Sequence, residues 1–120
     1  MNHCQDGLEV YFLTETQPYT AVQLYGYYEL QPNFVNGRPY YKMGWLGLWW
    51  DGIGHWYISD NDLVGQSAGF ATTDTDVFCP HQLHGSDWLV YDGSDWVYAL
   101  YIEGRLRITC KCLFIQNKIF

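Results

Sequence analysis

The chain has 120 residues and a mass of 14.1 kDa, which is typical of one domain and long enough to bury a hydrophobic core. Aromatic residues make up 19% of it and charged residues only 16%, against roughly 25% charged residues in an average protein, and this balance excludes a disordered chain. The net charge of −7 excludes nucleic acids and anionic membrane surfaces as expected partners, because both require a basic face.

The spacing of strand-forming residues and turn residues predicts an all-β domain, with a turn about every eight to twelve residues. Asn36-Gly37 is the strongest short hairpin motif in the chain. The longest irregular region is expected at residues 60–86, which are polar and contain several glycines. We expect strands at residues 8–14, 19–30, 45–50, 55–59, 87–91 and 96–102.

Two stretches of the chain are variations of one pattern: WWDGIGHWYIS at residues 49–59 and VYDGSDWVYAL at residues 90–100. Each has an aromatic residue, then Asp-Gly, then a tryptophan. Asp-Gly favours a turn, and the flanking rings are suited to packing across two strands. The pattern therefore predicts two copies of one aromatic hairpin that cover a β core.

The end of the chain predicts a final strand at residues 105–112, in which polar and apolar residues alternate with a period of two. Glu103-Gly104 is then the expected turn before this strand. Cys110 and Cys112 would lie on one face with side chains roughly 6–7 Å apart, too far for a disulfide between them. We therefore expect each to pair with a distant cysteine; Cys79–Cys110 with Cys4–Cys112 is favoured, and the swapped pairing remains open.

The cysteine count also predicts a location. Four cysteines in a small aromatic-rich domain favour two disulfides and an extracellular, oxidising environment. The sequence contains no run of about 18 apolar residues, which a membrane-spanning helix would require. Residues 1–7 have neither the basic nor the apolar part of a signal peptide, so a secreted form would be a mature chain or a fragment with an added Met1.

Three short motifs resemble a recurring extracellular β-module of secreted proteins from marine invertebrates and protists. They are Gly-Tyr-Tyr at 26–28, Asn-Gly-Arg-Pro-x-Tyr at 36–41 and Gly-x-Trp-x-Ile-Ser at 54–59, followed by Cys79-Pro80, Trp88 and Cys110. The resemblance covers about residues 20–110. It implies an extracellular β-fold in which these motif residues occupy turn and core positions, and it brings no catalytic residue or ligand.

Catalytic and metal chemistry are both poorly supported by the sequence. Residues 65–69 match the G-x-S-x-G nucleophile elbow, with Asp74, Asp76 and His84 downstream, but the elbow needs a helix after it and a parallel sheet around it. Residues 79–84 contain one cysteine and two histidines whose spacing is not that of a zinc site. The acidic clusters at 60–62 and 74–76 lack the spacing of a calcium loop. We expect no enzyme activity, no metal and no cofactor.

The tryptophans are the strongest candidates for a binding role. Adjacent residues of a strand point to opposite faces, so one of Trp49 and Trp50 should be exposed unless both faces are covered, and the same holds for His55 beside Trp56. Exposed rings with nearby polar groups are suited to stacking and hydrogen bonding a sugar. The predicted ligand-binding residues are Trp49, Trp50, Asp51, His55 and Trp56.

Together these observations predict one all-β domain over residues 1–120, an antiparallel sandwich or small barrel of about eight strands stapled by disulfides. The predicted function is extracellular, non-enzymatic recognition through an exposed aromatic face. The expected partner is carbohydrate or an extracellular protein. The alternative is a structural building block of an extracellular matrix or filament, in which the same aromatic face mediates self-association.

Overall fold

A computed structural model of the chain describes residues 4–12, 23–83, 88–91, 95–98 and 100–105. These residues form antiparallel strands and two short 3₁₀ turns. The elements are β1 Gly7–Phe12, β2 Gly26–Val35, β3 Arg38–Met43, β4 Leu46–Trp50, β5 Trp56–Asp60, η1 Asn61–Leu63, β6 Ala71–Thr73, η2 Pro80–Gln82, β7 Leu89–Tyr91, β8 Trp96–Tyr98 and β9 Leu100–Arg105.

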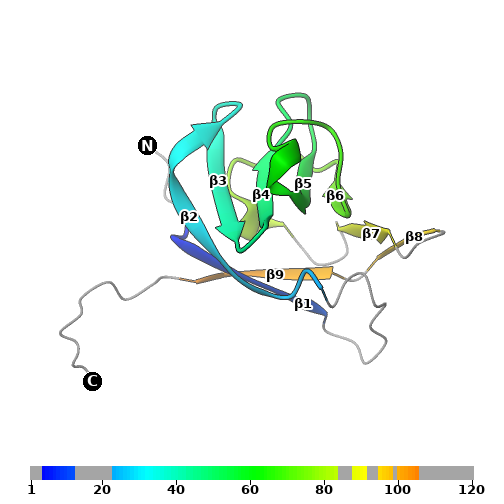
Figure 1. Cartoon of the computed structure of the whole chain (residues 1–120). Helices are drawn as coiled ribbons and strands as arrows, with labels where there is room; N and C mark the ends of the chain where they lie inside the picture. Colours follow the sequence, from blue (N-terminus) through cyan, green and yellow to red (C-terminus); the bar gives the residue numbers. More distant parts are fainter. Residues whose placement is uncertain (1–3, 13–22, 84–87, 92–94, 99, 106–120) are drawn as a thin grey trace, which may run out of the picture.

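The strands form one sheet in the order β8-β7-β6-β5-β4-β3-β2-β1-β9. Strands β1 to β8 follow one another along the chain, and β9 returns to pair with β1. The two edge strands are joined by one residue, because β8 ends at Tyr98 and β9 starts at Leu100. The Cα atoms of Tyr98 and Leu100 are therefore at most about 7 Å apart. The sheet therefore curls into part of a barrel, with β1 and β9 crossing below β3 and β4 (Figure 1). The predicted all-β antiparallel fold is confirmed, and its form is a single curled sheet.

Two predicted hairpins are confirmed. Asn36 and Gly37 join β2 to β3 with positive φ angles of 52° and 84°, the left-handed conformation that Asn-Gly adopts readily. Strands β4 and β5 pair from Leu46 opposite Asp60 to Trp50 opposite Trp56, around the predicted turn.

Two local predictions are wrong. Strand β6 lies within residues 60–86, which were expected to be irregular, and it pairs with both β5 and β7. Glu103 and Gly104 lie inside β9, opposite Glu9 and Leu8 of β1, rather than in a turn. Both segments gain their hydrogen bonds from strands distant in sequence, which local residue patterns do not reveal. The strand expected at residues 105–112 lies outside the described residues beyond Arg105.

The hydrophobic core fills the inner side of the curled sheet. Its central row runs across β4 to β7 through Leu48, Ile58, Ala71 and Val90, which are paired in register and fully buried. Large side chains fill the space around this row, and the fully buried members of the core cluster include Tyr28, Tyr41, Trp56 and Trp88.

The buried tyrosines keep their hydroxyl groups hydrogen-bonded. The Tyr28 hydroxyl donates to the Leu24 carbonyl at 2.8 Å, and the Tyr41 hydroxyl donates to the Gln5 carbonyl at 2.7 Å. Burial raises the pKa of both hydroxyls, so both stay neutral and act as donors. Tyr28 and Tyr41 belong to the motifs that resemble the extracellular module, and both occupy core positions.

A disulfide joins Cys4, which precedes β1, to Cys79, which precedes η2, with a Cα–Cα distance of 5.2 Å. Both pairings expected from the sequence are therefore wrong. The expectation rested on the alternation of residues 105–112, which carries no information on how close residue 4 lies to η2. Cys110 and Cys112 lie outside the described residues.

We expect the Cys4→Ser/Cys79→Ser double variant to lose about 4 kcal/mol of unfolding free energy, because the disulfide closes a loop with a sequence separation of 75 residues. Urea denaturation under non-reducing conditions measures the loss. The Cys110→Ser/Cys112→Ser variant is the control, and a non-reducing peptide map of it should retain the Cys4–Cys79 linkage. A native peptide linking Cys79 to Cys110 or Cys112 would contradict this assignment.

Candidate binding groove on the outer face of the sheet

Two of the predicted ligand-binding tryptophans are fully buried. Trp56 lies in the core, where its indole Nε1 donates to the Val77 carbonyl at 2.8 Å. Trp49 lies on the opposite face of the sheet, and its Nε1 donates to the Gln66 carbonyl at 2.9 Å. Both have 0% exposure. The expectation that they form an exposed aromatic face is wrong, because the loop after β5 covers the outer face of β4 here.

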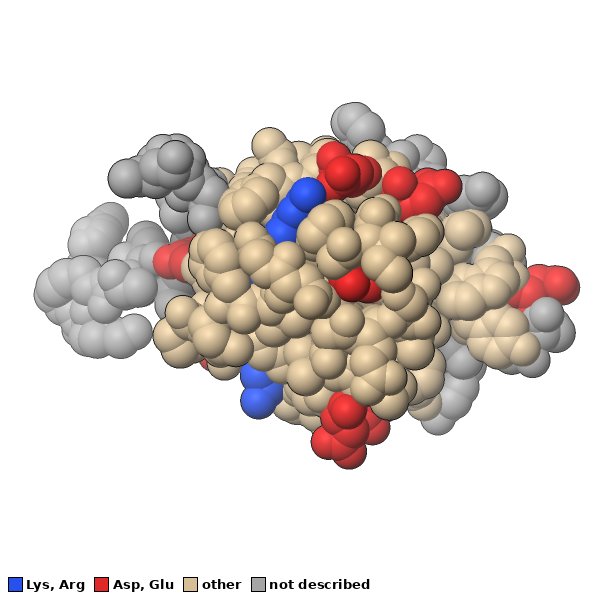
Figure 2. Space-filling model, turned by 90° about the horizontal axis from the view of Figure 1, so that it is seen from above, with Lys and Arg blue, Asp and Glu red and all other residues tan. Residues whose placement is uncertain are grey.

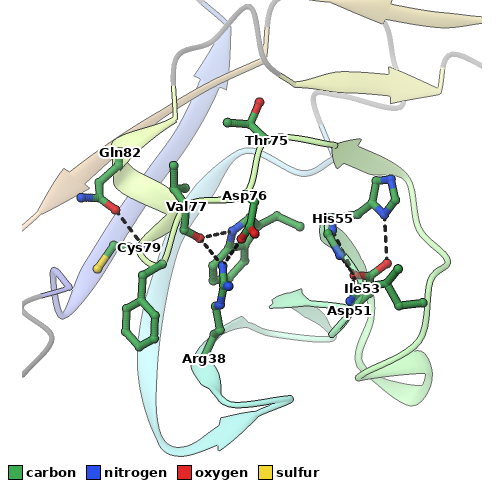
Figure 3. A network of polar contacts seen from close by, with 12 residues as sticks. Arg38, Asp51, Ile53, His55, Thr75, Asp76, Val77, Cys79 and Gln82 are labelled. Atoms are coloured by element: carbon green, nitrogen blue, oxygen red, sulfur yellow. Dashed lines mark hydrogen bonds and ion pairs between the residues drawn. The ribbon is translucent and has the colours of Figure 1, made fainter.

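Trp50 is half-buried, and the Arg38 guanidinium covers one face of its ring. The Arg38 guanidinium carbon lies 3.6 Å from the ring centroid, a cation–π contact. Arg38 Nη1 also donates to Asp76 Oδ1 at 2.6 Å and to the Val77 carbonyl at 2.8 Å (Figure 3). The Trp50 ring is thus used to hold Arg38 against the segment that precedes η2, and this contact occupies the ring face that a ligand would need.

Asp51 is buried and organises the turn between β4 and β5. Its Oδ1 accepts hydrogen bonds from the backbone N–H groups of Ile53, Gly54 and His55 at 2.9 to 3.0 Å. Its Oδ2 accepts the Ser67 hydroxyl at 2.7 Å and lies 3.2 Å from His55 Nδ1. The predicted ligand-binding Asp51 therefore has a structural role, and it positions His55.

The hydrogen bonds to Asp51 decide its charge state. Burial alone would raise the pKa of this carboxyl, but the Gly54 N–H, the Ser67 hydroxyl and the N–H groups of His55 and Ile53 together outweigh burial and hold the pKa well below its usual value. Asp51 is accordingly a carboxylate that stabilises the folded turn.

Ser67, Asp51 and His55 are the three residue types of a hydrolase triad, but their hydrogen bonds connect them in a different order. In a triad the histidine lies between the serine and the acid and takes the serine proton. Here Asp51 lies between Ser67 and His55, and a carboxylate of lowered pKa is a weak base. This geometry does not activate Ser67, although Ser67 is the central residue of the G-x-S-x-G match.

A groove of about 340 Å³ lies on the outer face of β5 to β8. Tyr57, Thr72 and Leu89 form one row across β5, β6 and β7. His55 is two residues before Tyr57, and Asp74 is two residues after Thr72, so both lie on one side of this row. Trp96 lies on the other side. Because residues two apart share a face of a strand, all six point to the same side of the sheet. The groove is lined by His55, Tyr57, Thr72, Thr73, Asp74, Leu89 and Trp96.

The polar groups of the groove differ in whether a ligand can reach them. The Thr72 Oγ1 atom has no hydrogen-bond partner among the described residues, but it is itself buried, so the surface of the groove does not present it, whereas the Asp74 side chain is exposed. His55 uses Nδ1 to contact Asp51, so Nε2 is the ring nitrogen left for a ligand. Of the predicted ligand-binding residues, His55 is the one that lines the groove.

Trp96 is not among the ligand-binding residues predicted from the sequence, although it takes the place in the second aromatic hairpin that Trp56 has in the first. In the first hairpin Trp50 pairs with Trp56, which is buried, whereas in the second Tyr91 pairs with Trp96, which is 45% exposed. Val90 is buried in the core, so the next residue, Tyr91, and its partner Trp96 must face outward. Assigning Val90 to the core is therefore the step that identifies Trp96 as an outer residue.

The groove has no Lys or Arg among its lining residues. Figure 2 shows a face of the molecule on which acidic groups appear at several separate places and basic groups at few. Arg38 is held by Asp76 and Trp50. The local charges therefore favour a neutral ligand over an anionic one.

We expect Asp51→Asn to destabilise the fold by about 1.5–3 kcal/mol at neutral pH, because an amide replaces a charged hydrogen-bond acceptor. The pKa of Asp51 is lower in the folded than in the unfolded chain. Its contribution is therefore complete above the unfolded-chain pKa of about 4 and is lost as the pH falls further toward the folded-state pKa. The stability difference between wild type and variant should shrink in acid, as measured by urea denaturation between pH 7 and pH 2.5.

The matched control for this measurement is Asp62→Asn, which changes an exposed carboxylate on η1. It should leave the acid dependence of stability close to that of the wild type. If Asp51→Asn and Asp62→Asn showed the same dependence on pH, the stabilising role of the Asp51 carboxylate would be refuted.

Comparison with known proteins leaves the function to be argued from the groove, since no protein-family model, curated protein or solved structure matches this chain. Within the described residues, no helix has the length and apolar character needed to cross a membrane. The same residues contain no group of three or more His, Cys, Asp or Glu side chains arranged to hold a metal ion. His84, one of the metal-ligand candidates in the sequence, lies outside the described part of the chain, as do Cys110 and Cys112.

Proposed function

We propose that this protein is an extracellular, non-enzymatic recognition module that binds carbohydrate in the outer groove. The observation that carries the proposal is the division of the groove into two sides. Trp96 supplies aromatic surface on one side of the central row, and His55 and Asp74 supply polar groups on the other side. Tyr57 adds a further ring within the row itself. Sugars have the same division, because an apolar face of C–H groups suits a ring and the hydroxyls around it need polar partners.

Asp74 and His55 have distinct roles in this proposal. The exposed Asp74 carboxylate accepts hydrogen bonds from sugar hydroxyls. His55, with Nδ1 facing Asp51, presents Nε2 to the groove for a hydrogen bond with another hydroxyl.

The charge of the groove and the disulfide support the same proposal. A neutral sugar requires no cation, and the groove has no Lys or Arg among its lining residues. The Cys4–Cys79 disulfide supports an oxidising, extracellular environment. The resemblance of residues 26–59 to an extracellular β-module supports the same location.

The competing proposal is a building block that self-associates through its exposed rings. Exposed aromatic side chains favour such contacts in general, and Trp96 would be buried at the interface. A net charge of −7 in each copy opposes close association at neutral pH. Light scattering under non-reducing conditions distinguishes the two, because a carbohydrate module needs only the monomer of 14.1 kDa.

We expect the native protein to bind neutral glycans on an array, with tryptophan fluorescence changing on binding. Trp96→Ala and Asp74→Asn should each weaken the binding of the best array ligand by tenfold or more in calorimetry, because one removes the stacking surface and the other a hydroxyl acceptor. Circular dichroism should show unchanged folding, since both side chains are exposed.

The control variant is Phe34→Ala, which removes another exposed ring, 6.5 Å from Phe78 and not part of the groove lining. It should bind glycans as the wild type does. Equal weakening by Phe34→Ala and Trp96→Ala would place the ligand outside the groove. A discrete oligomer that Trp96→Ala converts to monomer, without glycan binding, would support the building-block function instead.

A further inference from the structure

Four exposed aromatic rings extend from the groove along the outer face of the sheet. We call Trp96, Tyr91, Phe70 and Trp45 the aromatic stripe. The ring centroids of Trp96 and Tyr91 are 5.4 Å apart, and those of Phe70 and Trp45 are 5.9 Å apart. Each of the four side chains is between 37% and 55% exposed. The stripe shares Trp96 with the groove and runs beside it across β7 and β6 to Trp45, which precedes β4.

The register of β6 and β7 brings the two ring pairs of the stripe together. Ala71 pairs with Val90, and the Tyr91 N–H donates to the Phe70 carbonyl at 2.9 Å, so Phe70 and Tyr91 are neighbours across these two strands. Residues placed in this way have neighbouring side chains on one face. The stripe reaches from β8 to Trp45, which precedes β4, and so crosses four strand spacings. With strands about 4.8 Å apart it is roughly 19 Å long, which exceeds the length of one sugar ring.

The rings of the stripe do not lie in one plane. The planes of Tyr91 and Trp96 differ by 54°, and those of Trp45 and Phe70 differ by 72°. A flat crystalline surface stacks well only on coplanar rings, whereas a single chain in solution turns from one unit to the next and meets each ring at its own angle. Successive tilted rings therefore suit a flexible chain.

We propose that the aromatic stripe extends the groove into a site for one soluble chain of several neutral sugar units, with Trp96 holding the unit in the groove and Trp45 the most distant unit. This inference rests on the proposed carbohydrate function and adds the size and physical form of the ligand. It excludes a lone monosaccharide and a crystalline polysaccharide as the preferred ligand.

The charges favour a glycan over a second copy of the chain on this stripe. None of the stripe or groove residues is Lys or Arg, while Asp74 lies in the groove and Asp95 immediately precedes Trp96. A second copy would bring its own net charge of −7 against these carboxylates, at a cost that a neutral glycan does not incur.

The test compares ligand length with ligand form. The probes are cello-, chito- and malto-oligosaccharides of one to six units, together with microcrystalline cellulose and crystalline chitin. For the series that binds, affinity should rise at least tenfold from one unit to four. Trp45→Ala and Phe70→Ala should each weaken binding of the four-unit ligand about tenfold, equivalent to about 1.4 kcal/mol, and leave the one-unit ligand unaffected. Trp96→Ala should weaken both, and Phe34→Ala neither.

Several results would overturn the inference in distinguishable ways. Equal affinity for one and four units, or four-unit binding unchanged in Trp45→Ala, would refute the extended site and leave the groove function standing. Stronger binding to crystalline polysaccharide than to soluble chains would refute the argument from ring tilt. If no series bound and Trp45→Ala reduced an oligomer to monomer in light scattering, both the inference and the carbohydrate function would be refuted.

Discussion

The alternation of side chains across one curled sheet controls both the core and the candidate site. Leu48, Ile58, Ala71 and Val90 form an inner row that must stay buried, and this fixes every neighbouring residue of these strands on the outer face. Tyr57, Thr72 and Leu89 are each one position away from an inner residue, so the groove floor is a consequence of core packing. A shift of one residue in any of these pairings would place core side chains in the groove.

The polar end of the groove depends on loops that are tied together. Asn36 adopts a left-handed conformation and donates through Nδ2 to the carbonyls of Trp50 and Gly65 at 2.9 and 3.1 Å. Asp51 joins the turn after β4 to Ser67. Three connections on the outer side of the sheet are therefore held in one arrangement, and His55 is positioned before any ligand arrives. Such preorganisation lowers the entropy that a binding site loses when it is occupied.

The sequence predicts the fold better than the site, for physical reasons visible in particular residues. Asn36-Gly37 and the β4–β5 hairpin depend on local turn chemistry, so both are predictable. Strand β6 has three residues and gains its stability from β5 and β7, and without it Thr72 and Asp74 cannot be assigned to a face. The buried state of Trp49 depends on the loop at Gln66. The likeness of the two aromatic hairpins concealed that Trp56 and Trp96 face opposite ways.

The use of Arg38 inside the structure determines what the outer face can recognise. Its guanidinium is held by Trp50, Asp76 and the Val77 carbonyl, so the cation stabilises the end of the curled sheet. The groove lining contains one carboxylate, one histidine and two threonines and has no Lys or Arg. No Lys or Arg of the lining attracts anionic ligands, so affinity has to come mainly from contact with aromatic surface. Selectivity between neutral ligands of similar shape consequently depends on whether their hydroxyls meet His55 and Asp74, since a polar group left unpaired on binding costs more than its hydrogen bond contributes.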